Sequence, residues 1–295
     1  MLSETDEEAL TLLEKKPMSA LAHALATEII DTIKKDQLVL PTLPEVALKV
    51  REAAEDPDVC AASLSKVVEN DTALTARIIK VANSPLLRTN SAVEDLKMAI
   101  NRLGITFTAN LITGLAMEQM FQATSDKVDK IMREVWSHST EVAGISHVLC
   151  RHYTKLKPDQ ATLAGLVHEI GILPILTYVE SHDSQLDDDA LDEVIKLIHP
   201  KIGSAILKHW DFPEELIYVP SQYLNFKRNV EGKPDYVDVV MVANLQSHLN
   251  KEHPYNDLDW SSIPAFQKLG LDADVDSQES QDLSQEMADA MNLLK

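Results

Sequence analysis

Residues 70–84 read NDTALTARIIKVANS, and this stretch decides the fold class. Its apolar residues Leu74, Ile78 and Ala82 recur at intervals of four, which places them on one face of an α-helix. Asp71 suits the N-cap of this helix, and Pro85 follows where the helix should stop. The stretch therefore predicts an amphipathic helix that buries one side.

The same spacing recurs on both sides of this helix. It is present at Leu21, Leu25, Ile29 and Ile33, and again at Leu96, Ile100 and Leu103. We expect Gly104 to end the later helix and Thr106 to cap the next one. The chain has only 8 glycines, and apolar and polar residues rarely alternate, so strand signals are nearly absent. We therefore expect an all-α protein.

A second series of helices is expected between residues 125 and 250. A long helix carries Val135 and Ile145, and residues 161–176, ATLAGLVHEIGILPIL, form the least polar stretch of the chain. A helix this apolar is expected at the centre of the fold. Further helix starts are expected at Asp159, at residues 187–189 (DDD), at His199-Pro200, at residues 211–213 (DFP) and at Asp235.

These patterns divide the chain into four parts. They are a helical extension over residues 1–36, an N-terminal helical lobe over 37–124, a second helical lobe over 125–250, and an acidic C-terminal extension over 251–295. In the last part, helical spacing connects Leu283, Met287, Ala290, Met291 and Leu294. We expect this terminal helix to dock on the body of its own chain, with docking on another chain as the alternative.

The chain is strongly acidic, with 27 Lys and Arg against 47 Asp and Glu and a formal net charge of −20. Clustered cations bind nucleic acids and anionic membranes, so we expect neither as a partner. The nearest basic candidate, Lys227-Arg228 with Lys233, is too sparse to form a stripe. Cys60 and Cys150 are far apart, which excludes a CxxC unit, and the acidic N-terminus is unlike a signal peptide. A cytoplasmic protein is expected.

Several common active-site motifs are absent from the sequence, among them GxGxxG, GxxxxGK[ST] and GxSxG. His168-Glu169 is not part of an HExxH zinc site, because position 172 is Ile172. The pair lies between Gly165 and Gly171 in the least polar stretch, where a charged group costs free energy unless it is satisfied. From these residues alone, a hydrogen-bonded core histidine and a functional histidine are equally supported.

Three segments of the second half together resemble the HD superfamily of metal-dependent phosphohydrolases. They are Trp136-Ser137-His138, residues 166–171 (LVHEIG) and residues 242–245 (VANL). In that superfamily a His, a His-Asp pair and a late Asp hold a divalent metal that activates water against a phosphate ester. The resemblance implies His138, His168, Glu169 and Asn244 as the corresponding positions, so two of the four depart from the pattern.

Further segments resemble the HDOD (HD-related output domain) branch of that superfamily. They are residues 40–44 (LPTLP), 70–84 and 99–104 (AINRLG), and the positions His199, Gly203, Trp210 and Pro213, which look like the motifs HxxxG and WxxP. The resemblance extends over residues 36–250 and implies a multi-helix HD-like bundle with an N-terminal helical lobe. It also implies a module of bacterial signal transduction, including two-component systems.

The two departures make the implied metal site degenerate. Glu169 keeps a carboxylate on a side chain longer by one methylene, whereas Asn244 offers only a neutral amide oxygen, and hard divalent ions depend on carboxylate charge. Where cyclic-dinucleotide hydrolysing relatives carry a His-His pair, this chain has Tyr223-Leu224. We expect no cofactor, and His138 and His168 as buried residues in a polar network. The alternative is a divalent metal held by His138, His168 and Glu169.

The other family-motif positions have simple structural interpretations. We expect caps or turn formers at Asn70, Asp71 and Asn83, core aromatics at Trp136 and Trp210, and a solvated helix face at Arg77.

The resemblance and the degenerate site together predict a non-catalytic regulatory module that acts through protein partners. One alternative is a metal-dependent phosphohydrolase acting on a nucleotide or another phosphate ester. Another is a sensor that binds a nucleotide in the old pocket without cleaving it.

Overall fold

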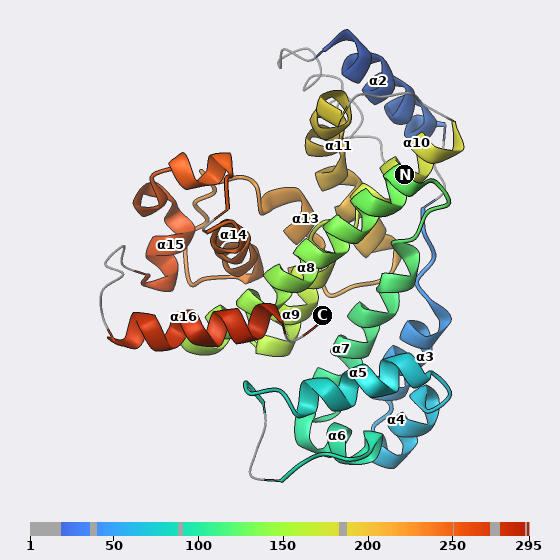
Figure 1. Cartoon of the computed structure of the whole chain (residues 1–295), viewed down its shortest axis with the longest axis vertical. Helices are drawn as coiled ribbons and strands as arrows, with labels where there is room; N and C mark the ends of the chain where they lie inside the picture. The colour runs from blue at the N-terminus through green and yellow to red at the C-terminus, as the bar shows by residue number, and fades with distance from the viewer. Residues whose placement is uncertain are drawn as a thin grey trace. The chain divides into compact units, whose positions relative to one another are not determined.

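The structure is a computed structural model of the 295-residue chain, and Figure 1 shows its helices. It describes residues 19–35, 40–87, 91–182, 188–249, 251–271, 278–292 and 294. Over these ranges every regular element is a helix, so the all-α prediction is confirmed. The chain forms two compact units, each assembled from three segments. The four predicted parts divide the chain along its length, and their boundaries stay a prediction.

The first unit comprises residues 1–42, 120–135 and 168–222. Its helices are α2 (Ala20–Lys34), α10 (Ile172–Ser181), α11 (Asp188–His209), α12 (Glu214–Ile217) and α13 (Val219–Gln222). Helix α11 packs against each of the other four. The core of this unit therefore forms around α11.

The second unit comprises residues 43–119, 136–167 and 223–295. Its first helices are α3 (Glu45–Glu55), α4 (Ala61–Val68), α5 (Thr72–Ala82), α6 (Leu96–Leu103) and α7 (Ile105–Ala116). After these come α9 (Pro158–Val167), α14 (Tyr236–Ser247), α15 (Pro264–Leu269) and α16 (Gln278–Met291), with short turns η2 (Pro254–Asp257) and η3 (Trp260–Ser262). The turn η1 (Met117–Met120) ends the run from α3, and the long helix α8 (Asp126–Tyr153) passes from the first unit into the second.

Helices α9 and α14 lie at the centre of the second unit. All residues of α9 from Ala161 to Val167 are buried, and so are those of α14 from Tyr236 to Leu245. The stretch Pro158–Ser181 is long and apolar enough to cross a membrane by length and composition, but 89% of its most apolar window is buried within the protein. Residues 161–176 are buried apart from Glu169, as predicted, but they form two helices and not one, because α9 ends at Val167 in the second unit and α10 begins at Ile172 in the first.

Three predicted helix boundaries are wrong, each for a local reason. Gly104 ends α6 and at once precedes α7 with a φ of 85°, so Thr106 lies inside α7 and is not its cap. Pro158 takes the first position of α9, which suits its missing N–H, so Asp159 lies in the first turn. His199-Pro200 does not start a helix, because Pro200 lies within the 22-residue helix α11, whose buried face continues through Ile202.

Candidate functional site

His138 and His168 are positioned by the packing of α8 against α9. A Cβ atom at Gly165 would lie 2.5 Å from the Cα atom of Ala143, so the two backbones are in direct contact at this point. Only a glycine leaves room for this approach. His138 precedes the contact by five residues on α8, and His168 directly follows the last residue of α9, Val167. The α8–α9 contact therefore fixes the backbone positions from which the side chains of His138 and His168 extend.

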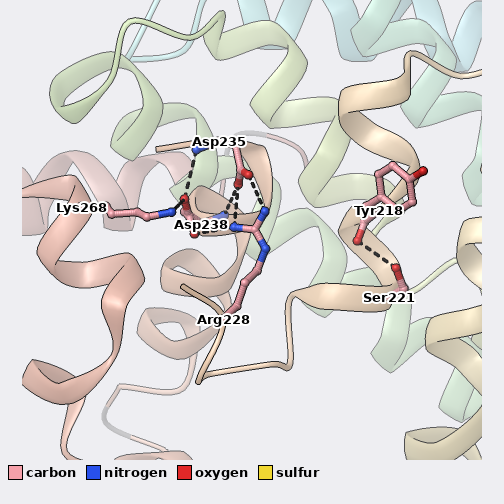
Figure 2. A network of polar contacts seen from close by, with 6 residues as sticks. All are labelled: Tyr218, Ser221, Arg228, Asp235, Asp238 and Lys268. Atoms are coloured by element: carbon pink, nitrogen blue, oxygen red, sulfur yellow. Dashed lines mark hydrogen bonds and ion pairs between the residues drawn. The ribbon is translucent and has the colours of Figure 1, made fainter. Parts of the chain in front are cut away.

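Asn244 lies in the interior of α14, and a buried charge network anchors the start of that helix (Figure 2). The Asp238 carboxylate accepts hydrogen bonds from Nη1 of Arg228 at 2.8 Å and from Nζ of Lys268 at 3.0 Å. Arg228 also pairs with Asp235, whose side chain and that of Asp238 form a capping box. The Asp238 side chain is fully buried, so this network fixes the start of α14 relative to α15 and to the preceding loop.

The side chains of His138 and Asn244 are joined by a hydrogen bond. Nε2 of His138 lies 3.0 Å from Oδ1 of Asn244, so the imidazole donates through Nε2 when the proton is placed there. Asn244 is 2% exposed, and its Nδ2 has no hydrogen-bond partner among the described residues. The amide at position 244 therefore binds the imidazole of His138, one of the candidate metal ligands.

The structure places His138 in the second unit, and His168 and Glu169 at the start of the last segment of the first unit. Their side chains carry atoms that can hold a metal ion, and no other group of three His, Cys, Asp or Glu could do so in the part of the chain that the structure describes. Two imidazoles and a carboxylate are a set that divalent transition metals accept. The donor types therefore fit a metal.

A group of aromatic rings that no sequence motif indicated adjoins His138. The ring of His248 lies 5.0 Å from that of His138 and stacks on His253 at 3.7 Å, measured between centroids. Tyr255 contacts both His248 and His253 edge-on. Burial, with the neighbouring histidines and Lys251, lowers the pKa of His248 to about 3. His248 is therefore neutral at pH 7 and adds no charge beside His138.

His199 and Gly203, the HxxxG positions, lie in the first unit and serve packing. A Cβ atom at Gly171 would lie 2.1 Å from the carbonyl oxygen of His199 and 2.6 Å from the backbone nitrogen of Gly203. His199 is buried in α11, and burial lowers the pKa of its side chain to about 3. These positions hold α11 against the turn that follows His168 and Glu169.

Other motif positions have the structural roles expected of them. Asp71 caps α5 by accepting a hydrogen bond from the backbone N–H of Leu74, and Asn83 makes two hydrogen bonds with the backbone of Val93. Trp136 and Trp210 are buried, and the indole of Trp210 donates to the Pro41 carbonyl at 2.9 Å. Asn70 lies in the turn before α5.

Arg77 does not lie on a solvated helix face, and that prediction is wrong. Its guanidinium pairs with the carboxylate of Glu118 and donates to the carbonyl of Leu294. Its side chain is 23% exposed. The reason is that the C-terminal segment covers this face, and no local sequence pattern around Arg77 could show it.

The family pattern of the HDOD domain matches residues 40–223. The chain belongs to the HDOD domain family. A protein from Shewanella amazonensis SB2B, named as a candidate metal-dependent phosphohydrolase, is 30% identical with a TM-score of 0.83, and the alignment covers 94% of this chain and all of that one. Asn244 lies outside the matched HDOD range, so its assignment to the site rests on its contact with His138.

Two further relatives are more distant. A protein from Marinobacter aquaeolei VT8, named as a candidate signal transduction protein, is 19% identical with a TM-score of 0.59, over all of this chain and 66% of that one. An uncharacterized protein from Treponema pallidum (strain Nichols) is 25% identical over 259 residues, or 82% of this chain. The chain spans about half the length of that protein, 48%.

Proposed function

We propose that this HDOD protein is a non-catalytic regulatory module of signal transduction that acts through protein partners. The observation that carries the proposal is the 3.0 Å contact between Nε2 of His138 and Oδ1 of Asn244. The side chain at this position is a neutral amide, and it engages the imidazole that a metal would need. The HDOD family and the likeness to a candidate signal transduction protein support the signalling role.

The charge of the site favours the same conclusion. Among His138, His168, Glu169 and Asn244, only Glu169 carries a negative charge at pH 7 when the imidazoles are neutral. Because divalent cations depend on carboxylate charge, one carboxylate holds a metal less tightly than the two of the HD pattern. We therefore expect weak metal binding and no turnover.

The second candidate function is a metal-dependent phosphohydrolase. It is favoured by the metal-binding donor types of His138, His168 and Glu169 and by the likeness to the Shewanella amazonensis protein. Neutral nitrogens of His138 and His168 and the Glu169 carboxylate would hold the ion. A bound divalent metal supplies a Lewis acid and an activated water. Nucleotide sensing without hydrolysis is a third hypothesis, and no contact of the described residues favours it over these two.

Metal content and turnover distinguish the two main candidates. Purified protein is analysed for metals and then assayed with added manganese on nucleotide, cyclic-dinucleotide and simple phosphate-ester substrates. We expect substoichiometric metal and no manganese-dependent turnover. One tightly held metal per chain together with metal-dependent hydrolysis would replace the regulatory proposal with the enzymatic one.

A paired substitution tests the site itself. Asn244→Asp with Glu169→Asp restores the ligand types of the HD pattern, and changes even in residues behind the ligands alter metal affinity by about 10 to 100-fold. A metal that binds only the folded state stabilises it, so manganese should raise the melting temperature of the double variant far more than that of the parent. Adding His138→Ala should abolish the increase. Equal metal shifts in parent and double variant would show that Asn244 does not belong to the site.

We propose that the protein is cytoplasmic. Cys60 and Cys150 are both free thiols, which fits a reducing compartment.

A further inference from the structure

The C-terminal helix α16 docks on a surface of its own unit that carries cations. Glu286 lies 2.8 Å from Nε2 of His152 and 3.4 Å from Nη1 of Arg151, both on α8. Beyond the helix, Arg77 of α5 binds the Leu294 carbonyl. Figure 1 shows α16 in red beside the C-terminal half of α8. We call the set Arg77, Gly144, Arg151 and His152 the α16 seat.

The seat admits a helix backbone at very close range. A Cβ atom at Gly144 would lie 2.1 Å from the carbonyl oxygen of Ala290 and 3.0 Å from the backbone nitrogen of Met291. Ala290 and Leu294 are buried, at 0% and 1% exposed. Gly144 therefore leaves space on α8, the slot, for a second helix that carries a small residue where the two backbones meet.

The ion pairs between α16 and α8 are accessible to solvent. Arg151, His152 and Glu286 have side chains that are 51%, 41% and 25% exposed, and ion pairs this accessible contribute little to stability. Residues 278–291 contain four acids, no Lys and no Arg. Arg77 is the exception, because its guanidinium is largely covered and its pKa is lowered by burial.

We propose that the α16 seat is the binding site for an acidic helix of a partner protein, and that α16 occupies this site when the partner is absent. The partner helix would carry a carboxylate for Arg151 and His152 and a small residue for Gly144. Arg77 is already paired with Glu118, so the seat selects a carboxylate through Arg151 and His152, and Glu286 of α16 shows the chemistry that fits. This inference rests on the proposed function only in taking the ligand to be a protein.

Because α16 is covalently linked to the rest of the chain, it competes effectively with a free ligand for the seat. A covalently linked segment has an effective concentration in the millimolar range, so a micromolar peptide does not displace it. Only a partner with better contacts, or a weakened α16, would open the seat. Occupancy of the seat therefore depends on the affinity of an incoming helix relative to the affinity of α16.

The test uses full-length chains and a labelled synthetic peptide of residues 278–295. Ala290→Arg introduces a long charged side chain at a fully buried position of α16 and leaves the seat unchanged. We expect the peptide to bind this variant at least about 10-fold more tightly than the parent, because the internal competitor is lost. Adding Gly144→Ala fills the slot and should abolish binding. A peptide with Glu286→Lys is the matched ligand control and should bind more weakly, because it places a cation against Arg151 and His152.

Each outcome decides the proposal. Equal peptide affinity for parent and Ala290→Arg, or binding that survives Gly144→Ala, would overturn it. A variant that elutes as a dimer in which α16 is exchanged would make a second copy of the chain the occupant and also overturn it. If Ala290→Arg does not fold, Glu286→Lys in the full chain weakens α16 at its contact with Arg151 and His152 and serves the same purpose. Metal content and hydrolysis do not enter these readouts, so a failure of the proposed function is separately visible.

Discussion

His199 places a neutral imidazole in the interior of α11, and this contributes to how the stability of the protein responds to acid. Burial lowers the pKa of His199 from 6.5 to about 3, so in this range the unfolded chain binds a proton that the folded chain does not. Well above pH 6.5, the pKa of the unfolded chain, His199 has no effect on the free energy of unfolding. As the pH falls below 6.5, proton uptake by the unfolded chain lowers that free energy. His147, with a pKa lowered to about 4 by burial, and His248, lowered to about 3, act in the same direction.

We predict that His199→Gln reduces by one the number of protons that the chain takes up on unfolding in acid. Between about pH 6 and about pH 4.5, the free energy of unfolding of the parent should fall more steeply than that of the variant, by about 1.4 kcal/mol per pH unit. Urea unfolding measured across this range checks the difference in slope. Above about pH 7.5 both histidine states are neutral, so the two curves should run parallel there. Equal slopes in acid would show that His199 takes up a proton in the folded state.

At the scale of elements, small residues decide how closely helices approach. Gly171 has a φ of −67°, which any residue adopts, so the glycine is needed for space alone. Elsewhere in a helical conformation an alanine would stabilise the chain by about 0.5–1 kcal/mol. Here its Cβ atom would lie 2.1 Å from the His199 carbonyl oxygen, and no flexible side chain can yield.

We predict that Gly171→Ala destabilises the protein by about 1–3 kcal/mol, the usual cost of overpacking. The control is Ser204→Ala on α11, because the Ser204 hydroxyl has no hydrogen-bond partner among the described residues and its loss should be nearly neutral. Chemical denaturation of the three proteins measures both effects. A stabilised Gly171→Ala protein would mean that the turn and α11 are not in backbone contact.

The helices could be predicted because their apolar spacing is a local pattern. The candidate site could be predicted only in part. Spacing of three and four along residues 70–84 is sufficient to locate α5, and Asp71 caps it as expected. The contact of His138 with Asn244 joins residues 106 positions apart, and that of Arg77 with Leu294 joins residues 217 apart. Only the family resemblance indicated the first, and nothing indicated the second. His248 and His253 belong to no motif, so their stacking beside His138 was not predictable.

At the scale of the whole molecule, the basic residues are few and several are already engaged. Arg228, the centre of the nearest basic candidate, is 9% exposed and pairs with Asp235 and Asp238. Arg102 donates to the carbonyls of Ala82 and Ser91. Such pairing leaves Lys227 and Lys233 without the neighbour that would extend them into a stripe. The structure therefore adds to the argument against nucleic-acid binding that was first made from the net charge of −20.

We predict that the protein does not bind nucleic acid directly. Phosphate backbones are held by clustered cations that release counterions, and here the field of the whole chain repels a polyanion. Filter binding to duplex DNA and to single-stranded RNA at about 10 mM salt is the most demanding measurement, because the screening length there is about 30 Å. We expect no retention up to micromolar protein, with a basic protein as the positive control. Micromolar binding that weakens steeply as salt is raised would reveal a cationic surface, since counterion release gives that dependence and a nonspecific apolar contact does not.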